Sequence, residues 1–130
     1  MKIDHIGVAV ESIDKALPFY RKLGLEPGHR EEVSSQKVRV AFLQAGEASI
    51  ELLEPLGGEG PIAKFLQTRG PGLHHLAFAT DDIKAEMSRL SAGGTPPLES
   101  DPRLGARGHK VCFIHHKHAS GVLVELVQHG

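Results

Sequence analysis

Near its start the chain reads Asp4-His5-Ile6-Gly7-Val8-Ala9-Val10-Glu11-Ser12-Ile13. The pattern returns 70 positions later (75 minus 5) as His74-His75-Leu76-Ala77-Phe78-Ala79-Thr80-Asp81-Asp82-Ile83. A second pair, Ile50-Glu51-Leu52-Leu53 and Val124-Glu125-Leu126-Val127, is offset by 74 positions (125 minus 51). The chain therefore consists of two related halves, and each half supplies one His from its first strand and one Glu from its last.

The first half predicts one strand, one helix and three further strands. Apolar alternation indicates a strand over residues 2–10, with His5 on the face of small residues. A helix over 14–23 is expected to begin at Asp14 or Ser12, to stop at Gly24 and to face a sheet with Leu17, Tyr20 and Leu23. The remaining strands are expected over 28–33, 37–44 and 48–53.

The second half repeats this order after a flexible break at 57–60 and a connector helix over 61–70. Its strands are expected over 74–80, near 97–99, over 110–115 and over 121–128, with a helix over 82–90 and a Gly-, Pro- and Arg-rich loop over 101–108. The sequence predicts an α+β fold with a single domain over 1–130. Module one covers about 1–56 and module two about 72–130, and two βαβββ modules form one curved, roughly eight-stranded sheet.

The four repeated polar residues are candidate metal ligands. In each strand they lie on the face opposite the apolar stripe, so we expect His5, Glu51, His75 and Glu125 to line the concave face of the sheet, where a ligand pocket is expected. Two imidazoles and two carboxylates suit Co²⁺, Ni²⁺, Zn²⁺ or Mn²⁺, with one or two positions left for water or substrate.

Composition excludes several classes of partner. Fifteen Lys and Arg balance 16 Asp and Glu, so we expect no overall positive potential that would attract nucleic acid or an anionic membrane. No apolar stretch approaches the length of a membrane span, and the first strand pattern begins at residue 2, which leaves no room for a signal peptide. We therefore expect a cytoplasmic protein. The single Cys112 lies in an apolar run and is interpreted as a buried thiol without chemistry.

Other histidines are left out of the metal site. His109, His115, His116 and His118 have no counterpart in the first half, so we interpret them as solvated or substrate-facing. His74 alternates with His75 and should point to the helix side of the sheet.

The chain resembles the vicinal oxygen chelate superfamily and, within it, the methylmalonyl-CoA epimerases. The resemblance is carried by the two repeated strands and by the more specific segments Pro61-Ile62-Ala63-Lys64-Phe65-Leu66, Pro102-Arg103-Leu104-Gly105-Ala106-Arg107-Gly108 and Gly121-Val122-Leu123-Val124-Glu125-Leu126. It implies the fold described above and places His5, Glu51, His75 and Glu125 around a divalent metal, for which we put Co²⁺ first.

The implied reaction interconverts the two epimers of methylmalonyl-CoA at carbon 2. Glu51 and Glu125, one from each module, are the expected proton-transfer pair as well as ligands. Some epimerases of this type carry a Gln at the Glu51 position and a Glu that acts as the catalytic base where this chain has Val40. Because this chain lacks that second Glu, Glu51 must serve as both metal ligand and base. The family also usually has Pro in place of His116.

The substrate implied is a small-molecule acyl-CoA, and Arg103, Arg107 and Lys117 are candidates for binding it. We expect a homodimer. Glyoxalase I shares the set of metal-ligating residues and is the alternative enzyme. The non-enzymatic alternative is a ligand-binding or resistance protein of the same fold, which would have no need for four metal-ligating residues. An extradiol dioxygenase, with its 2-His-1-carboxylate iron site, is disfavoured by the second Glu and by the short chain.

Overall fold

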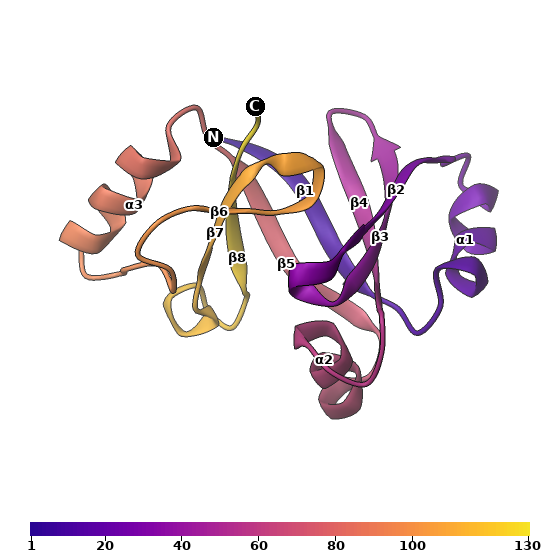
Figure 1. Cartoon of the computed structure of the whole chain (residues 1–130). Coiled ribbons are helices and arrows are strands. Elements are labelled where there is room, and N and C mark those ends of the chain that lie inside the picture. The colour runs from indigo at the N-terminus through magenta and orange to yellow at the C-terminus, as the bar shows by residue number, and fades with distance from the viewer. The chain divides into compact units, whose positions relative to one another are not determined.

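Both halves of the chain follow the predicted order of elements in the computed structural model, which describes residues 1–130 (Figure 1). The first half contains β1 (Lys2–Ala9), α1 (Ile13–Lys22), β2 (Pro27–Val33), β3 (Val38–Ala45) and β4 (Ala48–Pro55), and α2 (Pro61–Arg69) follows. The second half contains β5 (Gly72–Ala79), α3 (Ile83–Ala92), β6 (Arg103–Leu104), β7 (Lys110–Ile114) and β8 (Val124–Gln128). Short 3₁₀ turns lie at Ser34–Gln36, Ala106–Gly108 and His116–His118.

The strands form a mixed sheet with the order β2-β3-β4-β1-β5-β8-β7-β6. In each half the first strand pairs in parallel with the last, β1 with β4 and β5 with β8, while the other pairs within each half are antiparallel. The two βαβββ modules and the α+β class are therefore confirmed. The chain divides into two compact units, a first unit of His5–His74 and a second unit of Met1–Asp4 with His75–Gly130.

Helix α1 covers one face of the strands in the first unit (Figure 1). It begins where the Ser12 hydroxyl accepts a hydrogen bond from the Lys15 N–H at 3.3 Å, which settles Ser12 over Asp14 as the N-cap. Leu17 is buried as predicted, but the prediction for Leu23 is wrong, because this residue is the C-cap and is 61% exposed. The core of this unit consists of Val10, Ile13, Leu17, Ala41, Leu43 and Leu52.

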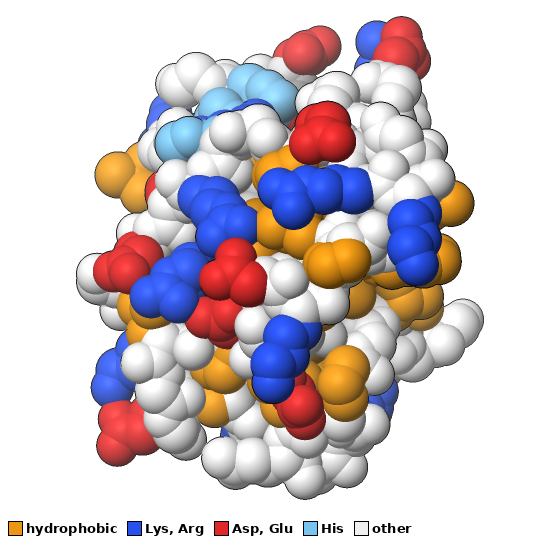
Figure 2. Space-filling view, turned by 90° about the vertical axis from the view of Figure 1, so that its right-hand side faces the viewer, with side chains coloured by type: hydrophobic (Ala, Val, Ile, Leu, Met, Phe, Trp, Pro, Cys, Tyr) orange, Lys and Arg blue, Asp and Glu red, His pale blue; other side chains and the backbone are white.

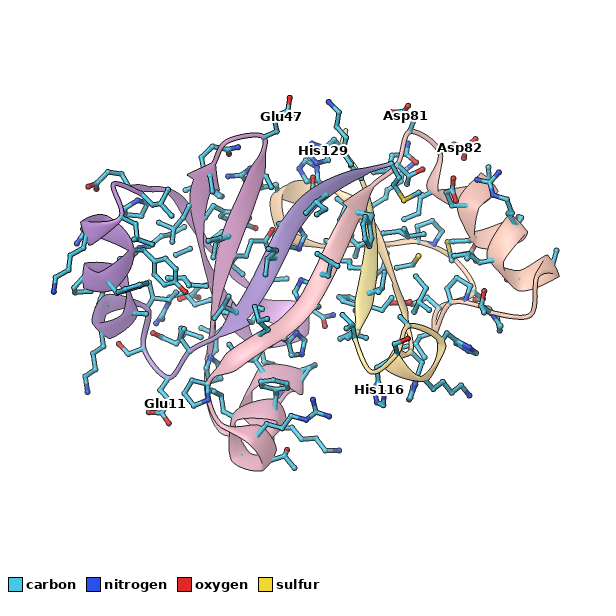
Figure 3. All side chains as sticks on the ribbon, turned by 180° about the vertical axis from the view of Figure 1, so that it is seen from behind. Glu11, Glu47, Asp81, Asp82, His116 and His129 are labelled. Atoms are coloured by element: carbon cyan, nitrogen blue, oxygen red, sulfur yellow. The ribbon has the colours of Figure 1, made fainter.

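Helix α3 has the equivalent place in the second unit. Its N-cap is Asp82, marked at the start of the helix in Figure 3, and the carboxylate accepts the Ala85 N–H at 3.1 Å. The helix buries Ile83 and Met87, and the core is completed by Cys112, Ile114 and Leu126.

The predicted strand near 97–99 is absent, and the edge strand is β6 at Arg103–Leu104, inside the segment interpreted as a loop. Residues 96 and 97 are both Pro and have no N–H to donate to a neighbouring strand. Only isolated bonds tie this segment to β7, such as the Leu98 N–H to the Phe113 carbonyl at 2.8 Å. Regular antiparallel pairing resumes where Arg103 lies opposite Val111.

Each sheet-covering helix is anchored at its N-terminus by the strand that carries the candidate ligand Glu. Glu54 Oε1 accepts the Ile13 N–H at 2.7 Å, and Gln128 Oε1 accepts the Ile83 N–H at 2.9 Å. Both acceptors stand three residues after the ligand Glu of their half. Arg39 also donates to Glu54, at 2.6 Å. The duplication therefore extends to the contact that fixes each helix to its sheet.

No helix of the chain is both long enough and apolar enough to cross a membrane. On the side of the molecule seen in Figure 2, Lys and Arg side chains alternate with Asp and Glu side chains. This mixture agrees with the balanced charge of the sequence.

We predict that Glu54→Ala lowers the free energy of unfolding by about 1–3 kcal/mol, because it leaves a partly buried helix N–H without its acceptor and removes one of the two carboxylates that bind Arg39. Gln128→Ala should cost about 1 kcal/mol, since only the Ile83 N–H loses its partner. Urea denaturation measures both, with Glu47→Ala in the exposed β3–β4 turn as the control. Unchanged stability in both variants would contradict the anchoring role.

Candidate metal centre

In the first unit His5 and Glu51 meet across the parallel pair β1 and β4. The register places Gly7 opposite Glu51, so His5 is the diagonal neighbour of Glu51 on the same face. Because Gly7 has no side chain, nothing from β1 stands between the two. His5 Nδ1 and Glu51 Oε2 are 3.0 Å apart.

The second unit repeats this geometry with different residues at the spacer position. Ala77 lies opposite Glu125 in the parallel pair β5 and β8, and His75 is the diagonal neighbour. His75 Nε2 and Glu125 Oε1 are also 3.0 Å apart. A small residue two positions after each His therefore allows the imidazole to reach the carboxylate.

These four residues are the only buried polar or charged residues in the chain, with 4–8% of each exposed. Burying an ionised carboxylate is costly unless positive charge and hydrogen bonds compensate for the lost water. A divalent cation bound to a carboxylate supplies such a positive charge.

The donor atoms also fit such a cation. Two ligand atoms bound at about 2.1 Å and at right angles around a metal lie about 3.0 Å apart, which is the separation observed in each pair. Neutral imidazole nitrogens and carboxylate oxygens together form a donor set typical of first-row divalent ions.

An aromatic residue stands beside each ligand Glu. Phe42 on β3 is opposite Glu51, and Phe113 on β7 is opposite Glu125. Val40 lies two residues from Phe42 on the same face and is 2% exposed. The position at which some epimerases carry a further Glu is therefore filled here by a buried aliphatic side chain.

The sequence matches the glyoxalase/bleomycin resistance protein/dioxygenase superfamily over residues 4–113. The ethylmalonyl-CoA/methylmalonyl-CoA epimerase of Cereibacter sphaeroides is 38% identical over 130 residues, covering 98% of this chain and 97% of that protein. The chain belongs to the methylmalonyl-CoA epimerase family of this superfamily.

Solved structures share the whole fold. A hypothetical protein from Bacillus halodurans has a TM-score of 0.97 at 45% identity, covering 99% of this chain and 94% of that one. A variant of the Streptomyces coelicolor methylmalonyl-CoA epimerase in complex with 2-nitronate-propionyl-CoA has a TM-score of 0.94 at 37% identity, covering 98% and 96%. The resemblance recognised in the sequence is therefore confirmed, and with it the vicinal oxygen chelate fold.

The remaining histidines lie elsewhere. His74 packs edge-on against Phe65 of α2, with ring centroids 5.0 Å apart, as expected for a residue on the helix side. The candidate cluster of His109, His115, His116 and His118 does not form one group. His109 stacks on His129, whereas His116 is in the turn at the other end of β8 (Figure 3).

The three substrate-binding candidates have different surroundings. Arg107 lies in the 3₁₀ turn of Ala106–Gly108 with a positive φ of 59°, and Lys117 is exposed in the His116–His118 turn. Arg103 is held on β6 by Glu99, at 3.1 Å. Sequence reasoning missed Glu99, since nothing in the pattern of a Pro-rich loop distinguishes a carboxylate that holds an arginine from a solvated one.

Cys112 is a fully buried free thiol on the helix side of β7, as predicted. Burial, reinforced by the negative charges of Glu99 and Glu125, raises its pKa to about 12. The thiolate is the reactive form, so Cys112 is kept out of chemistry at neutral pH.

We predict that Cys112 of the folded protein does not react with Ellman's reagent at pH 8 on the time scale of minutes, because the thiol stays protonated and covered. One thiol per chain should react at once in denaturant. Since folding raises this pKa, the contribution of the thiol to stability is complete below its unfolded pKa near 9 and is lost as pH rises toward 12. Rapid reaction of the folded protein would contradict this environment.

Proposed function

We propose that the protein is a metal-dependent epimerase that interconverts the two C2 epimers of methylmalonyl-CoA. The observation that carries the proposal is that the only buried polar or charged residues are two His–Glu pairs, one from each half of a chain in the methylmalonyl-CoA epimerase family. The substrate needs a proton removed from one face of carbon 2 and returned to the other. Two equivalent carboxylates supply that requirement.

Within this proposal His5, Glu51, His75 and Glu125 hold one divalent ion, with Co²⁺ first and Ni²⁺, Zn²⁺ or Mn²⁺ as alternatives. The donor atoms of His5, Glu51 and His75 are of the kind that such an ion requires. When bound, the ion supplies positive charge to the oxygens of the thioester and of the substrate carboxylate. The carbon acid between those two groups then loses its proton more easily.

Glu51 and Glu125 exchange the proton in our proposal. With Val40 in the neighbouring position there is no additional carboxylate on that part of β3, so Glu51 serves as both ligand and base. Glu125 acts from the opposite face of carbon 2. Removal by one carboxylate and return by the other inverts the centre.

The ligand of the Streptomyces relative supports this chemistry. A nitronate is planar at carbon and carries its negative charge on oxygen, and an enolate formed at carbon 2 of methylmalonyl-CoA has the same two properties. The solved structure of a variant of that relative is a complex with 2-nitronate-propionyl-CoA. A site of this fold therefore accommodates the planar anion that the proposed reaction requires.

Coenzyme A carries phosphates, and the net charge of the chain gives no general attraction to them. Arg107 and Lys117, both in turns, are the proposed cations of the coenzyme site, and Arg103 is the third cation proposed to bind the substrate. Loss of a contact made equally in the ground and transition states raises KM and leaves kcat unchanged. We further propose a cytoplasmic homodimer.

We predict that His5→Ala and His75→Ala each remove most of the bound metal while the protein remains folded, because each deletes one ligand and no part of the apolar core. Elemental analysis of purified protein measures the metal, and circular dichroism checks the fold. His116→Ala, in an exposed turn, is the matched control and should keep the full metal content. Full metal content in either variant would exclude that residue as a ligand.

We predict that Glu51→Gln and Glu125→Gln each lower epimerisation by roughly 10²-fold or more, the range typical of general acid–base catalysis. In deuterated water each variant should still exchange the substrate proton on one face without inverting it, since removal and return then use the same carboxylate. Glu47→Gln, in the exposed turn between β3 and β4, is the control. Epimerisation at the wild-type rate in both variants would show that the bases lie elsewhere.

A further inference from the structure

Arg103 is fixed in one orientation by two contacts within the second unit. Its Nε forms an ion pair with Glu99 Oε2 at 3.1 Å, and its guanidinium lies over the ring of Phe113, 5.2 Å from the centroid. Glu99 is itself fixed, because its other oxygen accepts the Phe113 N–H at 2.8 Å. The arginine is therefore held against a strand of the sheet although it comes from a short edge strand.

This fixed arginine stands next to the His75–Glu125 pair. Phe113 is opposite Glu125 in the register of β7 and β8, and its ring meets the His75 ring edge-on with centroids 5.7 Å apart. The guanidinium is thus separated from His75 by a single aromatic ring. The distance from the guanidinium carbon to the centroid of the His75 ring cannot exceed the sum of the two distances to the Phe113 centroid.

Most of the hydrogen-bonding capacity of Arg103 is unused. Only Nε forms an ion pair within the protein, so the two terminal nitrogens, Nη1 and Nη2, keep all their donors, and 39% of the side chain is exposed. A guanidinium presents these donors in a planar fork that matches a carboxylate, and it stays charged at any physiological pH. Such an arginine is a preformed receptor for an anion.

The first unit has the same arrangement with a weaker cation. His29 lies against Phe42, with ring centroids 5.4 Å apart, and is held by Glu31 at 2.9 Å. An imidazole is charged only when it is protonated, whereas a guanidinium is always charged. The side chain that lies over Phe113 is therefore a permanent cation, whereas the one that lies against Phe42 is not.

We propose that Arg103 binds the free carboxylate of the acyl group, and that Glu99 and Phe113 are its positioning residues. This role rests on the proposed function, since it assigns a group of the proposed substrate. The phosphates of coenzyme A lie at the far end of the pantetheine chain from the thioester. An arginine one ring away from a metal ligand is placed for the acyl end of the molecule, and it discriminates malonyl-type from uncharged acyl thioesters.

The test compares binding of malonyl-CoA and acetyl-CoA to the metal-loaded protein by isothermal titration calorimetry. The two ligands share the coenzyme and the thioester and differ only in the carboxylate. Arg103→Gln should weaken malonyl-CoA binding by roughly 10- to 100-fold, the value of a hydrogen bond to a charged group, and leave acetyl-CoA binding unchanged. Arg103→Lys should lose less, since it keeps the charge without the fork.

Arg89→Gln is the matched control, because Arg89 is an exposed arginine of the same unit that pairs with Glu86 on α3. It should change neither affinity. Glu99→Gln keeps an acceptor for the Phe113 N–H but loses the charge that holds Arg103, so it should weaken malonyl-CoA binding by several-fold and spare acetyl-CoA. This second variant keeps the proposal testable if Arg103→Gln does not fold.

Equal weakening of both ligands by Arg103→Gln would assign the arginine to the coenzyme and overturn the proposal, as would unchanged binding of both. The epimerase assay is read separately. A wild-type protein that prefers malonyl-CoA through Arg103 but does not epimerise methylmalonyl-CoA would refute the proposed function and leave the carboxylate receptor standing.

Discussion

Two carboxylates and two imidazoles are buried in an interior that is otherwise apolar, and the rest of the structure is arranged around the cost of burying them. Within each half the parallel pairing of the first and last strands brings the His and the Glu to 3.0 Å, with Gly7 or Ala77 leaving the space between them. Three residues further along the same strand, Glu54 or Gln128 binds the first N–H of the helix that covers the sheet. One strand in each half thus carries both the candidate ligand and the anchor of its helix.

The duplication explains why the two buried His–Glu pairs could be predicted from sequence. A single His or Glu on a strand carries little information, but the same residue type at matching positions of both halves, on the same face by strand alternation, singles out all four buried residues. The helix anchors repeat at the same offset as the ligand Glu residues. They were missed because a polar residue at the end of a strand is usually solvated, and only the structure shows that its side chain turns back to a helix N–H.

The part of the fold that could not be predicted is the segment between α3 and β7. Pro96 and Pro97 stand where the repeat predicts a strand, but they provide no N–H. Pairing with β7 therefore begins only at Arg103. The Glu99–Arg103–Phe113 arrangement depends on that delay, because it combines a side chain from the irregular segment, one from the edge strand and one from β7. Neither periodicity nor spacing encodes contacts between three such segments.

The two halves are alike in the groups that we propose to exchange protons and unlike in the groups beside them, and the proposed reaction requires both properties. Inversion at carbon 2 needs equivalent bases on its two faces, which Glu51 and Glu125 provide in our proposal. The proposed substrate, however, has different ends, so the same permanent cation in both halves would favour neither of two opposed orientations. In our proposal the difference between Arg103 in one half and His29 in the other removes that ambiguity.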